Sequence, residues 1–376
     1  MNCPRHGGNL VWAATLAGCP PESILDFSAS INPLGPPETA IAAIQAHLKT
    51  LTHYPDPSYQ SLCQVLSEVH RLPLDWFIPG NGSAELLTWA CRDLAQCAWT
   101  GILTPAFADY ARALQSFDAQ VRPYPINLVE QFSGNTLSLA KVLATAELTS
   151  IKVSQAPSLL LNHPHNPTGQ LLALKQVESC LEQFSLVVVD EAFIDFLPPG
   201  DQQSMIPWVM EHPNLVVLRS LTKFYSLPGL RLGYAVGHPE RLARWRQWRD
   251  PWCVNSLAVA AGIAALQDHS FQQQTWDWLT SARTQLSAGI AELPGLHPFP
   301  SLANFLLIAA DYPVPSLQTA LLKEHQIFIR DCLSFPELGA GYFRVAVRTA
   351  SENQRLLAAL ADCLPSLSTS TRILEA

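Results

Sequence analysis

The chain has 376 residues, of which 48% are hydrophobic and only 14% are charged. A single globular core seldom grows beyond roughly 250–300 residues, so this length predicts a large domain with a smaller one beside it. The low share of charged residues excludes an intrinsically disordered chain. With 23 basic and 31 acidic residues the net charge is −8, and no basic tract is present, which argues against nucleic acid as a partner.

Cysteine usage and hydropathy narrow the class further. The nine cysteines are odd in number and form no Cys-x-x-Cys pair, so neither a disulfide framework nor a zinc ribbon is indicated. The histidines show no metal-ligand spacing, and we predict no metal site. No stretch approaches the ~18–20 apolar residues of a membrane span, and the first residues lack the apolar core of a signal peptide. We therefore expect a cytoplasmic protein that does not bind membranes.

Short apolar runs alternate with longer helical patterns through the first two thirds of the chain, which is typical of β-α units on a parallel sheet. The predicted strands are 99–104, 158–162, 186–189, 215–219 and 233–236, and the predicted helices are 83–95, 110–117, 172–183 and 239–248. After about residue 255 the pattern changes. Helices at 257–267, 272–292 and 316–324, with strands at 303–309 and 343–347, predict a smaller α+β domain.

Polar residues follow the predicted strands, at the edge where a parallel sheet usually binds its ligand. Lys223 comes shortly after strand 215–219, where desolvation disfavours the ammonium form and favours a nucleophilic amine. Asp190 directly follows strand 186–189, and a carboxylate buried there needs a cationic partner. A pyridinium nitrogen is such a partner, and an Asp–Lys pair of this kind is typical of pyridoxal phosphate enzymes. The alternatives are a surface lysine and an aspartate that caps a helix.

Two further groups of residues are suited to a phosphate. Ser83 and Ala84 open a predicted helix, whose first N–H groups attract anions. Hydroxyls and a cation follow another strand end, namely Ser220, Thr222 and Arg231. Asn166, in the sequence Asn-Pro-Thr-Gly, is placed either to bond a cofactor ring oxygen or simply to form a turn. On successive strand ends, these features indicate pyridoxal 5'-phosphate as the cofactor.

These motifs together resemble those of fold-type I pyridoxal-phosphate enzymes, the aspartate aminotransferase-like transferases. The chain is similar to their histidinol-phosphate aminotransferase branch, whose His/Arg-Tyr-Pro-Asp-Pro segment stands here as His53–Pro57. The resemblance extends from His6 to about Arg348. It implies an α/β fold with an N-terminal arm (1–30), a large cofactor-binding domain with a mostly parallel sheet (31–265) and a C-terminal α+β domain (266–376).

The resemblance also implies a role for each matching residue. Lys223 would bind the cofactor covalently and later carry a proton to the substrate Cα, while Asp190 would pair with the pyridinium nitrogen. Phe107 would stack on the ring. The residues implied to hold the cofactor phosphate are Ser83, Ala84, Ser220, Thr222 and Arg231, with Asn166 at the ring oxygen. Tyr54 would reach the cofactor of a neighbouring subunit, which implies a homodimer with shared active sites.

Within the branch, several segments are similar to the threonine-phosphate decarboxylases of cobalamin biosynthesis. They are His6–Asn9, Asp26–Gly35, Arg330–Phe335 and Tyr342–Arg348, and Phe193 stands where aminotransferases of the branch usually carry tyrosine. The implied reaction converts L-threonine O-3-phosphate to (R)-1-amino-2-propanol O-2-phosphate and CO2. The residues implied to bind this small phosphorylated amino acid are His6, Asn32, Arg330 and Arg344.

Other interpretations remain open at this stage. The closest is an aminotransferase for histidinol phosphate or a related amino acid, with 2-oxoglutarate as second substrate. Another is a catalytically idle dimer that only binds the cofactor, although the intact pair of Lys223 and Asp190 argues against it. Taken singly, His6 is also typical of a solvated residue, Asn32 of a turn and Arg344 of an edge-strand charge.

Overall fold

The main sheet has seven strands in the order β2-β10-β9-β8-β6-β3-β4. We describe it from a computed structural model, which covers residues 6–128, 134–140, 142, 144, 156–201 and 203–374. The strands are β2 (Phe77–Asn81), β3 (Thr100–Thr104), β4 (Val121–Pro125), β6 (Ser158–Asn162), β8 (Leu186–Asp190), β9 (Leu215–Ser220) and β10 (Leu232–Gly237). Strand β10 runs antiparallel to both neighbours, and the other pairs are parallel. The predicted, mostly parallel sheet is confirmed.

Strand β8 shows why these segments form the centre of the sheet. Successive side chains of a strand point to opposite faces, so a strand covered on both sides is apolar throughout. Val187 and Val189 pack into one core cluster, and Val188 into a second one on the other face. The second cluster includes residues of α4 (Gly82–Leu94), α5 (Ala108–Gln115) and α8 (Pro239–Trp248), and the first includes residues of α7 (Leu174–Gln183). All four predicted helices of this part are present, each within three residues of its expected ends.

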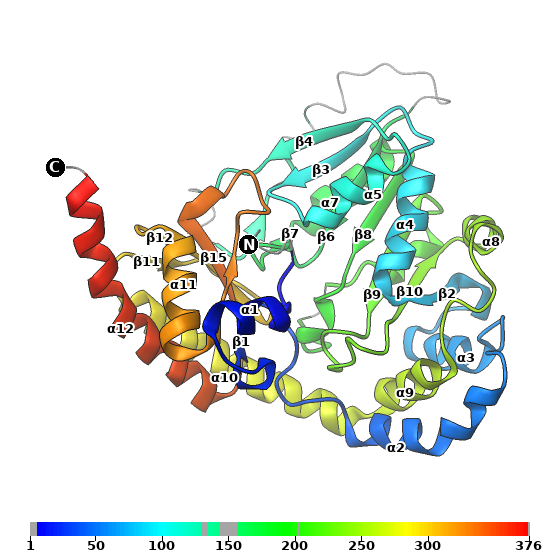
Figure 1. Ribbon diagram of the computed structural model, residues 1–376. Coiled ribbons are helices and arrows are strands. Elements are labelled where there is room, and N and C mark those ends of the chain that lie inside the picture. Colours follow the sequence, from blue (N-terminus) through cyan, green and yellow to red (C-terminus); the bar gives the residue numbers. More distant parts are fainter. Residues whose placement is uncertain are drawn as a thin grey trace.

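A second, antiparallel sheet has the order β11-β12-β15-β14. Its strands are β11 (Leu296–Pro298), β12 (Phe305–Ala310), β14 (Arg330–Asp331) and β15 (Tyr342–Ala346), and the helices beside it are α10 (His269–Ala291), α11 (Val314–His325) and α12 (Ala350–Leu374). Figure 1 shows this sheet and these helices on the opposite side of the molecule from α4 and α8. This is the predicted α+β unit.

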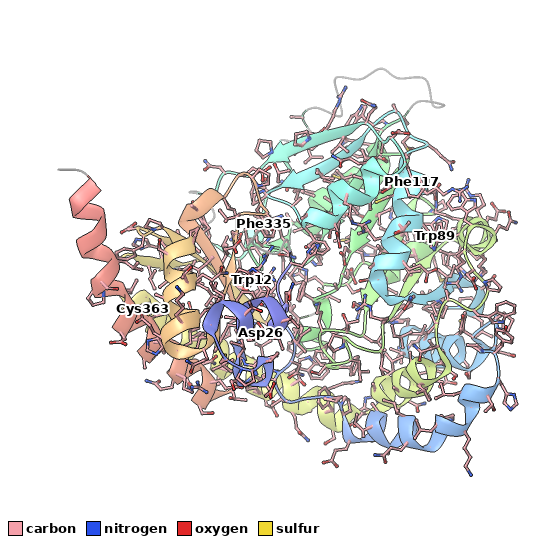
Figure 2. All side chains as sticks on the ribbon, in the orientation of Figure 1. Trp12, Asp26, Trp89, Phe117, Phe335 and Cys363 are labelled. Carbon is pink, nitrogen blue, oxygen red and sulfur yellow. The ribbon has the colours of Figure 1, made fainter. Side chains whose placement is uncertain are left out.

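The N-terminal segment packs on the smaller unit. Strand β1 (Leu25–Asp26) pairs in parallel with β13 (Ile327–Phe328), and helix α1 (Leu10–Ala17) packs against α11. Trp12 of α1 contacts the ring of Phe328, with centroids 5.5 Å apart (Figure 2). On these contacts we propose the same division as from the sequence, with an arm at 1–30, a large domain at 31–265 and a small domain at 266–376.

The predicted helix 257–267 is also confirmed, and the other remaining elements were not predicted from the sequence. Helix α2 (Glu38–His47) packs against α9 (Ser256–Gln267), and α3 (Gln60–His70) lies beside β2 and α9 (Figure 1). A short parallel pair is formed by β5 (Thr136–Leu137) and β7 (Leu171–Leu172). The single-turn helices are η1 (Pro21–Ser23), η2 (Leu48–Thr52), η3 (Leu74–Trp76), η6 (Ile194–Phe196), η7 (Ile206–Met210) and η8 (Gly339–Gly341). Among the described helices, none combines the length and the apolar character needed to cross a bilayer.

Candidate active site

A cavity of about 370 Å³ lies at the carboxyl ends of β6, β8 and β9, and residues of the antiparallel sheet and of the N-terminal segment also border it. All but two of the predicted site residues line it: His6, Ser83, Ala84, Phe107, Asn166, Asp190, Ser220, Thr222, Lys223, Arg231, Arg330 and Arg344. They come from segments that are distant in sequence, so the fold itself brings them together.

Asp190 is the last residue of β8, and it is buried. Its Oδ2 accepts a hydrogen bond of 2.8 Å from Tyr110 Oη, and its Oδ1 accepts one of 3.0 Å from the backbone N–H of Ala192. Burial raises the pKa of Asp190, while these two hydrogen bonds act in the opposite direction. The two donors fix the position of the carboxylate. A cation in the cavity would stabilise its ionised form further by charge attraction.

Lys223 lies in the turn after β9, and its amine borders the same cavity. Burial, with the guanidinium groups of Arg344 and Arg231, lowers the pKa of Lys223 to about 8. The backbone oxygen of Lys223 accepts a 3.1 Å hydrogen bond from the N–H of Asn32, which fixes the turn. The alternative of an ordinary surface lysine is therefore wrong, and a large fraction of this amine is neutral near pH 8.

Four residues suited to bind an anion gather where α4 begins, and we call this group the anion cradle: Ser83, Ser220, Thr222 and Arg231. Gly82 has a φ of +74°, and a Cβ placed on it would lie only 2.6 Å from Nη2 of Arg231. The missing side chain thus lets the Arg231 guanidinium approach the first turn of α4, beside Ser83. Across the cradle, the hydroxyls of Ser220 and Thr222 are 2.7 Å apart. Backbone N–H groups, two hydroxyls and a cation form a donor set suited to a phosphate.

The smaller domain contributes two arginines. Arg330 on β14 and Arg344 on β15 are register partners in the antiparallel sheet. Arg344 donates to Oδ1 of Asn166, and its guanidinium lies 4.7 Å from the ring centroid of Phe305. Burial, together with the neighbouring guanidinium of Arg330, lowers the pKa of Arg344 to about 10. Since β15 lies between β12 and β14, Arg344 is not an edge-strand charge.

Arg330 also faces this part of the cavity. It is buried, and its Nη2 donates a 2.6 Å hydrogen bond to Ser334 Oγ. Two guanidinium groups on one wall favour a ligand with more than one negative charge. His6 borders the cavity at its exposed side, where its Nε2 lies 3.5 Å from Asp109 Oδ1.

Two predicted residues lie elsewhere. Asn32 is buried outside the cavity, and its Nδ2 donates to Phe224 O and Thr275 Oγ1, both at 2.8 Å. Its Oδ1 accepts from Leu34 N, as in the turn interpretation. This placement does not support a substrate contact, and Asn32 instead positions the turn of Lys223. Tyr54 is 79% exposed and does not border the cavity of its own chain.

Several functional side chains were missed by the sequence analysis. Tyr110 bonds Asp190 from 80 positions away, and no local pattern in a predicted helix indicates such a contact. Asn162, the last residue of β6, donates a 2.8 Å hydrogen bond to Asp190 O and accepts one of 2.7 Å from Asn166 N. Its position at a strand end was the available signal. Phe193 was noted, and it borders the cavity while packing edge-on against Phe305.

His165, which directly precedes Asn166, does not border the cavity. It is fully buried, and its Nδ1 lies 3.0 Å from Thr168 Oγ1. Burial lowers the pKa of His165 to about 4, so the ring is neutral at physiological pH. The side chain packs within the Asn-Pro-Thr-Gly turn and carries no charge toward the substrate.

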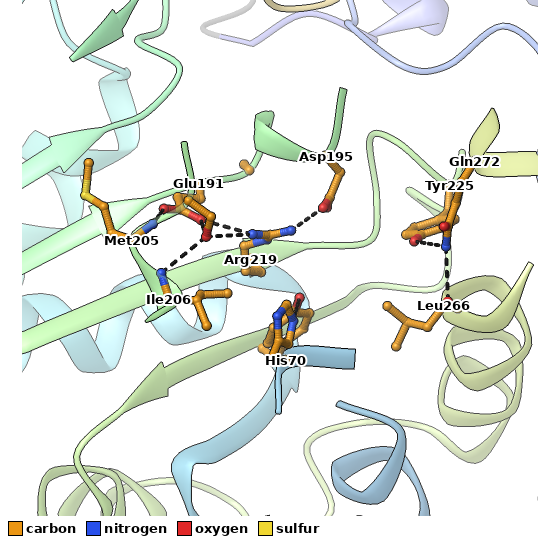
Figure 3. Close-up of polar contacts among 12 residues, drawn as sticks. His70, Glu191, Asp195, Met205, Ile206, Arg219, Tyr225, Leu266 and Gln272 are labelled. Atoms are coloured by element: carbon orange, nitrogen blue, oxygen red, sulfur yellow. Dashed lines mark hydrogen bonds and ion pairs between the residues drawn. The ribbon is translucent and has the colours of Figure 1, made fainter. Parts of the chain in front are cut away.

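Behind the cavity, a cluster of charged side chains joins the carboxyl ends of β8 and β9 (Figure 3). Its members are Arg219, Glu191 and Asp195. Arg219 precedes Ser220 on β9, and Glu191 follows Asp190. Nη1 of Arg219 lies 3.0 Å from Oε2 of Glu191, and Nη2 contacts Asp195. The Glu191 carboxylate also accepts 2.7 Å hydrogen bonds from Ser204 Oγ and Met205 N. Neighbouring strand residues point to opposite faces, so this cluster fixes from behind the ends that present Asp190 and Ser220 to the cavity.

Replacing Arg219 by methionine is expected to lower the free energy of unfolding by about 3–5 kcal/mol, because the buried Glu191 carboxylate and the half-buried Asp195 carboxylate lose their counterion. Urea denaturation of the cofactor-free protein, followed by circular dichroism, measures the change. Arg244→Met is the matched control: Arg244 also contacts a carboxylate, that of Asp93, at 3.4 Å, but its side chain is 48% exposed. The control should lose no more than about 1 kcal/mol. Equal losses in the two variants would show that the buried cluster contributes no more to stability than an exposed ion pair does.

The residues present fit pyridoxal phosphate. The cradle of Ser83, Ser220, Thr222 and Arg231 offers donors to a phosphate, Asp190 offers a fixed carboxylate to a ring cation, and Lys223 offers an amine to an aldehyde. Phe107 borders the same space and can cover an aromatic ring. No described residue accepts from Nδ2 of Asn166, which leaves that group able to donate to a ring oxygen.

Fold and site together define a pyridoxal-phosphate-dependent enzyme of fold type I. The chain belongs to the aminotransferase class I and II family, whose sequence profile matches residues 22–360. This confirms the family expected from the motifs.

Two curated relatives are similar over most of their length. The chain is 38% identical to threonine-phosphate decarboxylase of Salmonella typhimurium, over 96% of this chain and 97% of that one. It is 35% identical to histidinol-phosphate aminotransferase of Symbiobacterium thermophilum, over 89% and 88%. Among solved structures, histidinol-phosphate aminotransferase from Sinorhizobium meliloti in complex with pyridoxal-5'-phosphate has a TM-score of 0.81 at 22% identity, covering 98% and 100% of the two chains. The structural likeness confirms the aspartate aminotransferase-like fold.

The lowered pKa of Lys223 predicts how cofactor attachment depends on pH. Only the neutral amine attacks an aldehyde, so the rate at which the cofactor-free protein attaches pyridoxal phosphate should rise about tenfold per pH unit below pH 8. Above about pH 8 the rate should level off. Stopped-flow absorbance at fixed cofactor concentration measures this profile. A rate that keeps rising to pH 10 would mean that the amine titrates like an ordinary lysine.

Proposed function

We propose that this chain decarboxylates L-threonine O-3-phosphate to (R)-1-amino-2-propanol O-2-phosphate and CO2, as a pyridoxal-phosphate-dependent lyase of cobalamin biosynthesis. The observation that carries the proposal is the pair of arginines, the buried Arg330 and the half-buried Arg344, on the same cavity as Lys223 and Asp190. A substrate with both a phosphate and a carboxylate matches two such cations. The extended similarity to a threonine-phosphate decarboxylase supports the same substrate, and a cytoplasmic location is part of the proposal.

Different residues of the chain have different roles in the proposed reaction. When bound, pyridoxal phosphate supplies a ring that accepts the electrons released at the substrate Cα. Asp190, held by Tyr110, would face the ring nitrogen as a fixed carboxylate, which favours the positively charged form of that nitrogen and so would strengthen this acceptance. The two arginines orient the substrate by its anionic groups. Because CO2 leaves without a proton, Cα must then receive one, and the Lys223 ammonium is the donor that borders the cavity.

The second candidate is an aminotransferase, which is favoured by the similarity to histidinol-phosphate aminotransferases. The two reactions differ in which bond at the substrate Cα breaks. For decarboxylation this is the bond to the carboxylate, and for transamination the bond to hydrogen. The arginines hold the anions, so their placement decides between the two outcomes.

The deciding experiment gives the cofactor-loaded protein L-threonine O-3-phosphate and measures CO2 together with the phosphorylated amine. Release of both in equal amounts is expected. No release, with the pyridoxamine form of the cofactor appearing from histidinol phosphate, would contradict the proposal and establish the aminotransferase. Arg344→Met, tested in parallel, should lower kcat/KM by about 10²-fold or more, because a buried charged contact to the substrate is lost.

A homodimer with shared active sites is part of the same proposal. Tyr54 is 79% exposed and its ring lies 4.6 Å from that of Trp252, which is 46% exposed. Leu48 and Leu51, on the preceding turn η2, are also exposed. Exposed apolar side chains that gather in this way are typical of subunit contacts, and they support a second chain at this surface.

Mixing two inactive variants tests the shared site. If Tyr54 serves the partner's cavity, a heterodimer of Lys223→Ala and Tyr54→Ala subunits contains one intact site. When the two variants are unfolded together and refolded, random pairing makes about half of the dimers heterodimers. Each heterodimer has one intact site of two, so about one quarter of the wild-type activity should return. Activity that stays at the sum of the separate variants would contradict the sharing of sites.

A further inference from the structure

The hydroxyl of Ser30 is a buried polar group with no hydrogen-bond partner among the described residues. Ser30 is 2% exposed, and it borders the cavity together with Arg344 and Lys223. Buried hydroxyls nearly always have a partner, since an unmet one costs free energy. A partner that arrives with the ligand would remove this cost.

Hydrogen bonds fix the backbone on both sides of Ser30, so the residue is held at the cavity wall. On one side, Phe27 O accepts a 2.8 Å hydrogen bond from Ala346 N at the end of β15. On the other, Asn32 N donates to Lys223 O at 3.1 Å. The segment therefore spans the cavity wall from the strand of Arg344 to the turn of Lys223, with Ser30 midway.

The neighbouring hydroxyl shows the contrast. Ser28 Oγ also borders the cavity, but it accepts from Gly8 N at 2.7 Å and donates to Asp26 Oδ1 at 2.6 Å. It is thereby used to hold the N-terminal arm in place. In this segment, the donor that stays available for a ligand is Ser30.

The surroundings indicate which ligand chemistry this donor serves. The charged groups that border the cavity near the segment include Arg344 and Lys223, and a cationic wall attracts anionic oxygens. We infer that Ser30 Oγ donates a hydrogen bond to an anionic oxygen of the substrate and so helps to determine specificity. The inference rests on the proposed function only for the identity of the substrate, whose anionic oxygens belong to a phosphate and a carboxylate.

The test compares Ser30→Ala with the wild-type holoenzyme by stopped-flow titration, in which the change in cofactor absorbance reports ligand binding before CO2 is released. The dissociation constant for L-threonine O-3-phosphate should rise about 10- to 100-fold, as expected for one hydrogen bond to a charged group. Ser30→Cys, which is close in size but a weak donor, should give an intermediate rise. The matched control is Ser67→Ala. Ser67 lies on α3 outside the cavity and its Oγ donates to Leu72 O, so this variant should keep the wild-type dissociation constant.

Two ligands that each lack one anion identify the oxygen. The amine product carries only the phosphate, and L-threonine carries only the carboxylate. Weaker binding of the product to Ser30→Ala assigns the hydrogen bond to the phosphate, and weaker binding of threonine assigns it to the carboxylate. Either result supports the inference. The inference would be overturned if Ser30→Ala and Ser30→Cys both bound all three ligands with wild-type affinity, with cofactor loading and circular dichroism unchanged.

Failure of the proposed function gives a different result. The wild-type enzyme would then release no CO2 from threonine phosphate, whatever Ser30 does. The comparison of Ser30→Ala with wild type remains informative in that case with histidinol phosphate as the titrated ligand, because it measures binding and not turnover.

Discussion

Replacement of Lys223 by alanine is expected to lower kcat by about 10⁴-fold or more. The variant loses the amine that bonds the cofactor, and it also loses the group that delivers a proton to Cα, a role that alone contributes roughly 10²–10⁴-fold. Among the described residues, no other lysine borders the cavity, so none can replace Lys223. Single-turnover measurement of CO2 release by the purified variant gives the result.

The control is Lys175→Ala, which removes an exposed lysine from α7. Its activity and cofactor spectrum should match those of the wild type. Lys223→Ala should still fold and bind the cofactor through its phosphate cradle, but the absorbance band of the covalent form should be lost. If that band is lost while every measured activity stays unchanged, the chain is an idle cofactor-binding protein and the catalytic interpretation is wrong.

The contrast between Lys223 and Tyr110 shows what a sequence can predict about such a site. Lys223 and Asp190 follow apolar runs that are strong strand signals, and parallel strands place their ends at one edge, so the pair was predictable. Tyr110 lies inside an amphipathic helix, and its bond to Asp190 depends on how α5 packs on the sheet. That geometry has no local sequence pattern. For the same reason, the sequence analysis did not predict a ligand contact for Ser30, which it included only within the segment Asp26–Gly35.

Asn32 illustrates the opposite error. Its segment resembles that of the decarboxylases, and this suggested a substrate contact. The structure shows that its amide is used by Phe224 and Thr275, two residues that are about 190 and 240 positions away. A segment can therefore mark a family because it positions the catalytic turn, and motif similarity does not separate positioning residues from those that contact substrate. The fold class was easier to predict, since alternating strand and helix patterns are local.

Replacement of Asp190 by asparagine is expected to lower kcat by about 10²–10³-fold, the range seen when one fixed electrostatic group is removed from an active site. The amide keeps the shape of the side chain but has no charge, so the ring nitrogen of the bound cofactor would lose its proton more easily. Cofactor absorbance as a function of pH should therefore change in the variant, a signal that a purely structural defect does not produce.

Tyr110→Phe separates the charge of Asp190 from its position. It removes the 2.8 Å hydrogen bond but leaves the carboxylate charged. One hydrogen bond to a charged group is worth about 1.5–3 kcal/mol, and part of that is recovered because Ala192 N–H still holds the carboxylate. The loss in kcat should accordingly be about tenfold, smaller than that of Asp190→Asn. If both variants lose activity equally and the absorbance of neither changes with pH, Asp190 acts by holding the end of β8 and not by its charge, and the electronic role assigned to it would be wrong.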